Sequence, residues 1–321
     1  MPVDVLLVSL GGTAGWRAAD AQLMGALRRA GAEVAQASAR LGRDLPTFAL
    51  HDLAQALAVR RAAQAAIVEH RPRSILYSST TAALLWPRSG AIRFDAAAAD
   101  NRPGRHGVWQ RPLERRRMAQ APLLVPMSEG ALAGAPNPRA ESVVVSVPIE
   151  PSGPTGEPRD IAAVTYGADP TKRRLDLVLR AWSHARRGGE TLVVAGASGE
   201  AIEGVRFAGL LDALDFRALL RRARVFVTAP RREDFGQTQL EALADGAMLV
   251  TTPAPGPYAA LPIARALDPR LVGDDLVTAL RTALDDPRPD YAERAAVVLT
   301  PYRRVTIDRV VAEELLPRLV G

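Results

Sequence analysis

Apolar residues along the chain fall into short runs, and longer segments with helical spacing separate these runs. The run at residues 3–10 predicts a buried strand, and the spacing of leucine and alanine predicts a helix over residues 18–30. A second strand predicted at residues 32–37 completes a βαβ unit. The alternation continues with a helix over residues 52–69 and with strands at residues 74–78, 93–95, 122–127 and 142–147. It predicts a parallel sheet with helices on its faces.

The pattern stops at residues 148–158, where four prolines and two glycines in eleven residues exclude a packed element. A second series of strands is predicted at residues 161–165, 191–195, 205–208, 225–229 and 248–252. We therefore expect a first domain over residues 1–149, a linker over residues 150–158 and a second domain over residues 159–300. Both are expected to be doubly wound, Rossmann-like α/β domains that face a cleft. The last helix is predicted at about residues 305–316, ending near Pro317.

The composition is that of a globular protein, with 321 residues, of which 48% are hydrophobic and 24% charged. No apolar run approaches the roughly 20 residues of a membrane-spanning helix, and no basic signal-peptide region precedes the first strand. The chain has no cysteine, which excludes disulfides, thiolate metal sites and a cysteine nucleophile. Its four histidines, His51, His70, His106 and His184, show no metal-ligand spacing. The sequence therefore predicts a cytoplasmic protein without a protein-bound metal.

The net charge of +6 belongs mainly to the first half of the chain. Residues 1–157 hold 18 arginines against 13 Asp and Glu, a surplus of +5, whereas residues 158–321 hold 23 Lys and Arg against 22 Asp and Glu. A basic surplus favours an anionic partner, such as a lipid surface, a phosphorylated substrate or nucleic acid. A general preference for arginine would produce the same surplus, and the sequence leaves both explanations open.

Two glutamates eight residues apart stand out in the second domain. Glu233 follows the strand predicted at residues 225–229, and Glu241 lies in the helix predicted after Gly236. Ligands of open parallel sheets bind at the carboxyl ends of the strands, and the N-terminus of a helix binds phosphate through its free N–H groups. A glutamate two turns into that helix lies within reach of a ribose. The pattern therefore predicts a nucleotide site at this loop.

The segment from Arg231 to Gly246 resembles the E-x7-E signature of retaining GT-B glycosyltransferases, the nucleotide-sugar group that includes glycogen synthases and phosphatidylinositol mannosyltransferases. The resemblance is specific over residues 164–258. It implies the GT-B fold, with a C-terminal segment at about residues 302–321 that crosses back to the first domain. It also implies that the first domain binds the acceptor, that the second binds the donor, and that transfer retains the anomeric configuration. In this family the departing phosphate takes the acceptor's proton, so neither a protein base nor a cofactor is expected.

The resemblance assigns roles to residues around the glutamate pair. Glu233 is expected to contact hydroxyl groups of the transferred sugar and to orient the donor. Glu241 is expected to accept hydrogen bonds from the ribose of the nucleotide. The donor diphosphate is expected at the start of the helix, which comprises Phe235, Gly236, Gln237 and Thr238.

Lys172 is the single lysine among 41 basic residues. An ammonium group is a compact point charge, whereas a guanidinium is a planar fork, so a retained lysine indicates a place where a fork does not fit. A chance survivor on a solvated helix start is the alternative. In the resembling family a basic residue at this strand–helix turn holds the donor diphosphate, which assigns that role to Lys172, helped by Arg173. Many relatives also carry an arginine where this chain has Ala168, so the clamp on the diphosphate departs from the family pattern.

The first domain offers four further candidates. Gly12 and Thr13 follow the first predicted strand, but the sequence GGTAGW is not a dinucleotide fingerprint, which disfavours a nicotinamide enzyme. In the resembling family a glycine loop here approaches the donor diphosphate and the acceptor, and a tight turn without a ligand is the alternative. Asp95 ends a predicted strand, and His106 lies in a glycine-flanked loop. Both are candidates for contact with the transferred sugar or the acceptor, with helix caps and surface contacts as the other explanation.

Taken together, these features predict a glycosyltransferase whose acceptor is anionic or displayed on an anionic surface. A lipid-linked or cell-envelope glycan is the first choice, and a base in DNA is the less favoured one. Arg102, Arg105 and Arg111 are the arginines expected to face the acceptor, and peripheral contact with the inner face of a membrane fits this picture. Two alternatives stay open: a nucleotide-sugar hydrolase or epimerase on the same fold, and a nucleotide-sugar-binding partner subunit without chemistry, which Ala168 keeps open.

Overall fold

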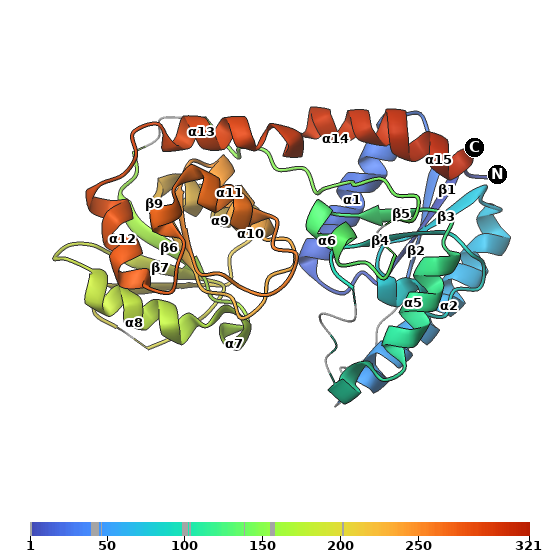
Figure 1. Ribbon diagram of the computed structural model, residues 1–321, viewed down its shortest axis with the longest axis horizontal. Coiled ribbons are helices and arrows are strands. Elements are labelled where there is room, and N and C mark those ends of the chain that lie inside the picture. Colours follow the sequence, from blue (N-terminus) through green and yellow to red (C-terminus); the bar gives the residue numbers. More distant parts are fainter. Residues whose placement is uncertain are drawn as a thin grey trace. The chain divides into compact units, whose positions relative to one another are not determined.

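The computed structural model describes residues 2–39, 45, 47–97, 102, 104–137, 139–154, 158–200 and 202–321. The chain divides into two compact units (Figure 1). The first unit comprises Met1–Pro148 and Arg304–Gly321, and the second comprises Ile149–Arg303. Within the described residues each unit holds one five-stranded sheet, so the predicted α/β fold with two parallel sheets is confirmed.

The sheet of the first unit has the strand order β2-β1-β3-β4-β5, and its strands pair in parallel. These strands are β1 (Val5–Ser9), β2 (Val34–Ser38), β3 (Ser74–Tyr77), β4 (Ala91–Phe94) and β5 (Leu124–Pro126). The helices of this unit are α1 (Ala14–Arg29), α2 (Phe48–His70), α3 (Thr80–Ala83), the 3-10 helix η1 (Gly104–Gly107), α5 (Gln110–Gln120), α6 (Glu129–Ala133), α14 (Arg304–Val310), the π-helix η4 (Val311–Leu315) and α15 (Leu316–Val320).

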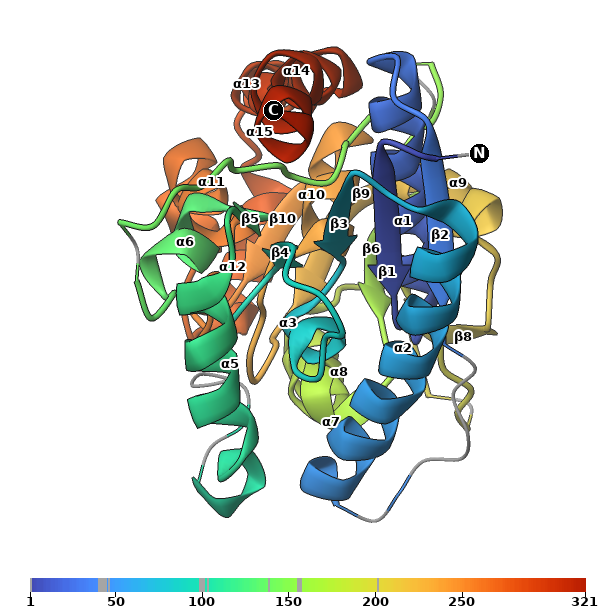
Figure 2. The ribbon, with the colours of Figure 1, turned by 90° about the vertical axis from the view of Figure 1, so that its right-hand side faces the viewer.

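Helices cover both faces of this sheet, because alternate residues of a strand point to opposite sides (Figure 2). On one side Leu6 of β1 packs in a cluster that includes Val59 of α2. On the other side Leu7 packs in a cluster that includes Leu27 of α1 and Val311 of the C-terminal segment. The C-terminal segment is therefore part of the core of the first unit.

Residues 142–147, predicted as a strand, do not form one. The N–H of Leu124 donates to Glu141 C=O at 2.9 Å, and the N–H of Val143 donates to Leu124 C=O at 3.0 Å. The next bond of this ladder has to come from the N–H of residue 126, which is proline and has none. The segment therefore runs beside β5 as extended chain that is not part of the sheet.

The last helix does not end near Pro317 as predicted. The chain stays helical through α14, η4 and α15 as far as Val320. Proline normally ends a helix because it has no N–H and its ring meets the carbonyl four residues earlier. Here the wider turn of the π-helix ends at Leu315, and Pro317 is accommodated in the first turn of the α-helix that follows.

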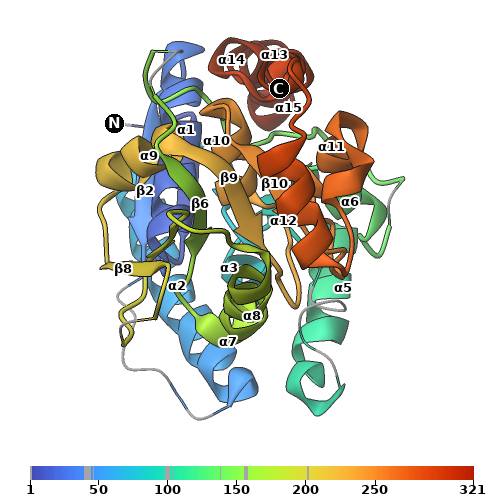
Figure 3. The same cartoon turned by 90° about the vertical axis from the view of Figure 1, so that its left-hand side faces the viewer.

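The sheet of the second unit has the strand order β10-β9-β6-β7-β8, again with parallel pairing (Figure 3). Its strands are β6 (Ile161–Tyr166), β7 (Leu192–Ala195), β8 (Val205–Gly209), β9 (Ala223–Thr228) and β10 (Met248–Thr251). The helices are α7 (Pro170–Arg173), α8 (Leu175–Ala185), α9 (Ala213–Arg222), α10 (Gln237–Ala244), α11 (Ala260–Leu267), η2 (Pro269–Leu271), α12 (Leu276–Asp285), α13 (Tyr291–Val298) and η3 (Thr300–Tyr302). Because β6 and β9 are neighbours, the loops after these two strands lie at the same edge of the sheet.

Hydrogen bonds join the start of the predicted linker, residues 150–158, and the residue before it to the rest of the second unit. The N–H of Ile149 donates to Tyr302 C=O at 2.8 Å. The N–H and the hydroxyl of Ser152 donate to the carboxylate of Asp245 at 2.8 and 3.0 Å. Residues 155–157 of this segment lie outside the described residues.

Candidate active site

Glu233 and Glu241 lie on one strand–loop–helix unit of the second sheet. All of β9 except Arg224 is buried, and Glu233 stands on the loop that follows this strand. The helix α10 begins at Gln237, so Glu241 lies in its second turn. The structure therefore has Glu233 at the carboxyl edge of the parallel sheet and Glu241 in the helix next to it, as the sequence predicts.

The carboxylate of Glu233 is largely buried and is held by two side chains. Glu233 is only 7% exposed. The Arg173 guanidinium pairs with Glu233 Oε2 at 2.5 Å, and the Gln239 side-chain amide donates to the same oxygen at 3.1 Å. Both partners contact Oε2, so the carboxylate has a fixed orientation and its charge is balanced by one arginine.

A second arginine ties the short helix α7, which carries Lys172, to the loop of Glu233. The N–H of Arg231 donates to Lys172 C=O, and the Arg231 guanidinium donates to Thr171 C=O, both at 2.9 Å. Lys172 itself is exposed, and its N–H donates to Asp169 Oδ1 at 3.0 Å. The structure therefore brings together Lys172, Arg173 and Glu233, three of the residues predicted for the site.

A glycine on the next loop fixes the backbone of Glu233. The N–H of Glu233 donates to Pro255 C=O at 3.1 Å, and its C=O accepts from the N–H of Tyr258 at 3.2 Å. Gly256, between these partners, has φ +110°, and a Cβ placed there would stand 2.3 Å from Glu233 O. A residue other than glycine would have to push this carbonyl away. The loop over residues 252–258 is thus the support of Glu233.

The start of α10 leaves backbone donors for a ligand. Gly236 caps the helix in the left-handed conformation, with φ 85°, and no side chain caps it. The first helical bond runs from the N–H of Leu240 to Gly236 C=O at 3.0 Å, so the N–H groups of the first turn, which includes Gln237 and Thr238, have no acceptor within the helix. Phe235 is buried, with its ring 6.2 Å from that of Tyr302. The Phe235 ring therefore packs inside the unit.

In the first unit Gly12 and Thr13 lie on the loop between β1 and α1. The Thr13 side chain caps α1 by accepting from the Trp16 N–H at 3.2 Å. The Arg17 guanidinium donates to Gly11 C=O and Gly12 C=O at 2.9 and 3.2 Å. The loop is thus tied to the first turn of the helix that follows it.

A buried polar cluster lies under this loop. The hydroxyl of Ser9 accepts from the N–H of Gly11 at 3.0 Å and donates to the carboxylate of Asp20. Asp20 also faces Arg93 of β4 at 3.3 Å, and both side chains are 1% exposed. Burial raises the pKa of Asp20 and lowers the pKa of Arg93, because each charge has lost its water.

The cluster connects the glycine loop to the end of β4. Asp95, one of the residues predicted for the site, directly follows β4 and is half-buried, and its charge acts on Arg93. Arg93 therefore lies beneath both the Gly12–Thr13 loop and Asp95. His106 falls in η1, and its side chain lies outside the described residues.

Two of the three arginines predicted to face the acceptor are engaged within the first unit. Arg102 pairs with the buried carboxylate of Asp52 at 2.8 and 3.1 Å. Arg111 donates to Gly104 C=O at 2.7 Å and so stabilises η1. Arg105 is exposed. The prediction that all three are available to an anion is therefore wrong for Arg102, whose charge is paired with Asp52, and Arg111 uses part of its donors for backbone carbonyls.

Solved structures share the fold over nearly the whole length of the chain. A structure from E. coli, described as trehalose-6-phosphate bound with UDP-2-fluoro glucose, has a TM-score of 0.72 at 11% identity and covers 98% of this chain and 99% of its own. A trehalose-6-phosphate synthase, studied for glycosyl transfer with retention, has a TM-score of 0.70 at 12% identity and covers 97% and 98%. WaaG, a glycosyltransferase involved in lipopolysaccharide biosynthesis, has a TM-score of 0.68 at 13% identity and covers 99% of both chains. At these identities the likeness shows the fold.

The sequence of the second unit decides the class of protein. Residues 160–286 match the family model described as Glycosyl transferases group 1, and this range includes Lys172, Glu233 and Glu241. Together with the shared fold, this match indicates a glycosyltransferase of the GT-B type. Comparison with curated protein sequences gives no match.

The sequence analysis missed several residues that support Glu233 in this glycosyltransferase. Gln239 is 1% exposed. Its amide nitrogen donates to Glu233, whereas its Oε1 is buried and has no hydrogen-bond partner in the part of the chain that the structure describes. The hydroxyl of Tyr258 shares a hydrogen bond of 2.7 Å with that of Thr251, and burial raises the pKa of Tyr258 to about 12. Gln239 lies on the same side of α10 as the loop, which the E-x7-E spacing alone does not reveal.

Arg174 was also missed. It adopts φ 47°, which is uncommon for a residue with a side chain, and its guanidinium donates to Ala229 C=O at 2.6 Å and to the Thr252 hydroxyl at 2.9 Å. It therefore links the loops after β6, β9 and β10. No sequence signal distinguishes Arg174 from the many other arginines of the glycosyltransferase.

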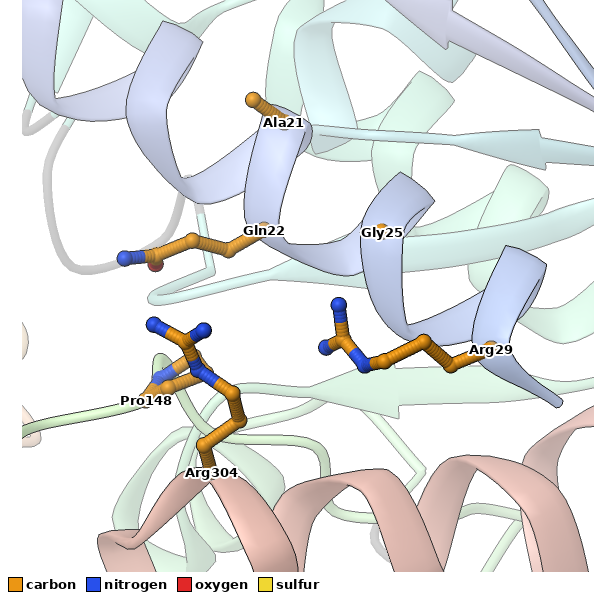
Figure 4. A pocket seen from close by; sticks show the side chains of 6 residues that line it. All are labelled: Ala21, Gln22, Gly25, Arg29, Pro148 and Arg304. Atoms are coloured by element: carbon orange, nitrogen blue, oxygen red, sulfur yellow. The ribbon is translucent and has the colours of Figure 1, made fainter.

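One cavity of about 240 Å³ lies apart from these residues, in the first unit (Figure 4). It is lined by Ala21, Gln22, Gly25, Arg29, Pro148 and Arg304. The Arg29 guanidinium pairs with Asp308 of α14 at 2.7 Å. Within the part of the chain that the structure describes, no group of three or more His, Asp or Glu is placed to hold a metal ion. No helix in this part is both long and apolar enough to cross a membrane.

Glu241 provides a test of stability against pH. Burial raises its pKa above the ordinary 4.5, although Gln237 donates to Glu241 Oε1 at 2.9 Å. A carboxyl group with a raised folded-state pKa destabilises the fold as pH rises from the unfolded pKa through the folded one, and the full penalty is present at neutral pH. Glu241→Gln is therefore expected to raise the melting temperature at pH 7, by about 2–4 °C for each kcal/mol of penalty removed, and to leave it unchanged near pH 4.

The measurement is thermal unfolding of both proteins at steps between pH 4 and pH 8. Glu293→Gln, at an exposed position in α13, is the matched control and should show no pH-dependent gain. A Glu241→Gln protein less stable than the parent at pH 7 contradicts the prediction.

Proposed function

We propose that this glycosyltransferase moves a sugar from a nucleotide-diphosphate sugar to an acceptor hydroxyl with retention of anomeric configuration. The observation that carries the proposal is the arrangement around Glu233. A carboxylate held by Arg173 and Gln239 stands beside the uncapped start of α10, with Glu241 in the next turn and Lys172 in α7, which follows the neighbouring strand. This set supplies acceptors for sugar and ribose hydroxyls and donors for phosphate.

The donor diphosphate is assigned to Lys172 and the first turn of α10. Lys172 is exposed, a lysine side chain has a flexible stem, and the helix start adds N–H donors and a positive dipole end. These groups stabilise the negative charge that grows on the leaving diphosphate. The proposal therefore requires no protein-bound metal or cofactor.

Arg173 supplies the charge that Ala168 does not. It stands five residues after Ala168, and its guanidinium reaches Glu233 in the structure. An arginine at this place can serve the carboxylate and the nearest phosphate oxygen together, because a guanidinium carries five N–H donors. Arg173 can therefore replace the arginine that relatives carry at the place of Ala168. This favours an active enzyme over a partner subunit without chemistry.

The sugar and the ribose are assigned to the two glutamates. Glu233 accepts hydrogen bonds from hydroxyls of the transferred sugar through the oxygen that its protein partners leave open. Glu241 accepts from the ribose hydroxyls. Its burial raises its pKa, and a nucleotide that donates two hydrogen bonds stabilises the ionised form.

Retention follows from transfer on one face of the sugar. The bond from the anomeric carbon to the diphosphate oxygen breaks, the acceptor oxygen attacks that carbon from the same side, and the departing phosphate oxygen takes the acceptor's proton. A structural neighbour of the chain, a trehalose-6-phosphate synthase, is described as transferring with retention. No protein base is needed in this scheme.

The acceptor is assigned to the first unit, with Gly12, Thr13, Asp95 and His106 as the candidate contacts. The surplus of +5 over residues 1–157 favours an acceptor that is anionic or displayed on an anionic surface. A lipid-linked or envelope glycan is favoured over a DNA base. WaaG, which shares the fold, acts in lipopolysaccharide biosynthesis.

A thermal-shift screen of nucleotides and nucleotide sugars tests the donor part of the proposal. A ligand at 100 times its dissociation constant stabilises the folded state by about 2.7 kcal/mol. We expect one nucleotide diphosphate and its sugar to raise the melting temperature, and its nucleoside to raise it less. The best donor is then incubated with lipid-linked and soluble acceptors, and the product's anomeric configuration is read by NMR.

Each outcome of this assay is informative. An inverted product overturns retention, and free sugar or an epimer formed without acceptor points to the hydrolase or epimerase instead. Binding of a nucleotide sugar without turnover on any acceptor supports the partner subunit. No shift with any nucleotide contradicts the donor site.

A further inference from the structure

The helix α2 carries apolar residues on both of its faces. Val59 and Ala63 are buried in the core on the sheet. Leu50, Leu53 and Leu57 are 52%, 38% and 41% exposed. Their spacing of three and four residues places them on one side of the helix, where they form an exposed leucine stripe. A helix that only had to cover the sheet would carry polar residues there.

The length of α2 explains why the leucine stripe has no partner in the sheet. The helix has 23 residues, which span about 34 Å, whereas the five residues of β1 span about 17 Å. Roughly half of α2 therefore extends past the strands. Figures 1 and 2 both show the start of α2 projecting beyond the sheet. The three leucines lie in the first ten residues of the helix, on this projecting half.

A second apolar group lies at the same end of the unit. The side-chain N–H of Trp109 donates to Ala49 C=O at 3.2 Å, which joins the segment after η1 to the first turn of α2. Val108, next to this tryptophan, is 65% exposed. The projecting end therefore presents side chains from two separate segments of the chain.

The stretch of chain that contains the apolar group is rich in arginine, and two of its five acids are buried. Residues 48–120 hold twelve arginines against five Asp and Glu. Of the acids, Asp52 and Glu114 are 2% and 3% exposed, and Asp52 is neutralised by Arg102. The exposed arginines of this region include Arg61, Arg105, Arg115 and Arg116. An exposed apolar stripe in a basic part of the chain is complementary to an anionic lipid bilayer, whose interior takes the apolar side chains and whose headgroups take the charges.

We propose that the leucine stripe and these arginines dock the first unit onto an anionic membrane surface. The leucines enter the boundary between headgroups and acyl chains, and the guanidinium groups pair with lipid phosphates. Helices that follow parallel strands begin at the carboxyl edge of the sheet, the edge that holds Gly12, Thr13 and Asp95. Docking would therefore bring this edge to the lipid surface. The inference deepens the acceptor part of the proposed function, on which its relevance to catalysis rests.

Co-sedimentation of the purified full chain with lipid vesicles tests this inference. The probes are vesicles of equal parts phosphatidylglycerol and phosphatidylcholine, and vesicles of phosphatidylcholine alone, without donor or acceptor. We expect binding to the anionic vesicles and at least tenfold weaker binding to the neutral ones. The variant L50Q/L53Q/L57Q is expected to bind the anionic vesicles about a hundredfold more weakly, because three partly exposed leucines no longer leave water. R115Q/R116Q is expected to bind about 25-fold more weakly at low salt, with the difference closing at high salt.

The matched control removes at least as much exposed apolar surface elsewhere. Leu214, Val297 and Val305 are 81%, 71% and 77% exposed, more than the leucines of the stripe. L214Q/V297Q/V305Q should bind vesicles as the parent does. Equal losses in the control and the stripe variant overturn the inference. So does a parent chain that ignores anionic vesicles, or a stripe variant that changes a dimer to a monomer in sedimentation analysis but still binds vesicles.

Unfolding and activity are read separately from vesicle binding. The melting temperature of each variant must stay near that of the parent, as expected for surface positions. Activity is measured with a water-soluble acceptor, which the stripe variant should still use at the parent rate. A chain that binds vesicles but transfers no sugar disproves the proposed function and leaves the docking surface standing. A chain that transfers sugar but does not bind vesicles supports the proposed function and disproves the docking surface.

Discussion

Replacing Glu233 with glutamine is expected to lower kcat about a hundredfold, with the dissociation constant of the donor changed less than threefold. Glutamine has the same size and still accepts from Gln239, but it has no charge. The hydrogen bonds that the carboxylate makes to sugar hydroxyls strengthen as the sugar becomes cationic in the transition state, and a hydrogen bond to a charged group contributes about 1.5–3 kcal/mol. The loss therefore appears in turnover more than in binding.

The measurement is steady-state kinetics together with donor binding by calorimetry. Glu293→Gln, which removes one exposed carboxylate from the same unit, is the control and should leave kcat unchanged. The release of Arg173 from its partner will lower the melting temperature somewhat, so the assay is run well below it. Normal turnover with every working donor would mean that the E-x7-E assignment fails.

Replacing Lys172 with alanine is expected to weaken binding of the nucleotide-diphosphate donor by about 1.5–3 kcal/mol, or about 10- to 150-fold. The nucleoside alone should bind almost unchanged, because it carries no phosphate. Lys172→Arg is expected to restore only part of the affinity, since a planar fork does not reproduce a point charge. Fold stability should not change, because the Lys172 side chain is exposed and only its backbone is used by the fold.

Titration calorimetry with the best donor and with its nucleoside measures both effects. Arg180→Ala removes one positive charge from an exposed position of α8 and serves as the matched control. If that variant loses as much affinity as Lys172→Ala, the effect belongs to the net charge of the unit. Equal losses for donor and nucleoside count against a phosphate role for Lys172.

The two units handle buried charge differently. In the second unit the Arg173–Glu233 pair retains partial contact with solvent, with side chains 18% and 9% exposed, so a ligand can join it. In the first unit both side chains of the Asp20–Arg93 pair are 1% exposed, and Arg93 Nε has no hydrogen-bond partner among the described residues. A pair as deeply buried as this one is weak evidence for stability, because the lost hydration offsets the attraction. The pair lies beneath the Gly12–Thr13 loop and Asp95, so holding these candidate site residues in place explains the buried pair better than stability does.

Several features of this glycosyltransferase could be predicted from its sequence. Strands and helices follow from which side of each segment is apolar, a local property that a single chain displays. The strand before Glu233 and the helix that carries Glu241 were therefore predicted, whereas the class of protein came from the resemblance of this segment to the E-x7-E signature. The singular Lys172 was visible in the composition, although its role stays a prediction.

Only the tertiary structure decided which of these residues meet. Arg173 reaches Glu233 because β6 and β9 are neighbours in the sheet, and strand order is not written in the periodicity of either strand. Gly256 is required by a carbonyl 23 residues earlier in the chain. Arg102 is withdrawn from the surface by a carboxylate fifty residues away. Local pattern reports burial, whereas the partner of a buried charge depends on how distant segments pack, and so the geometry of the site had to come from the fold.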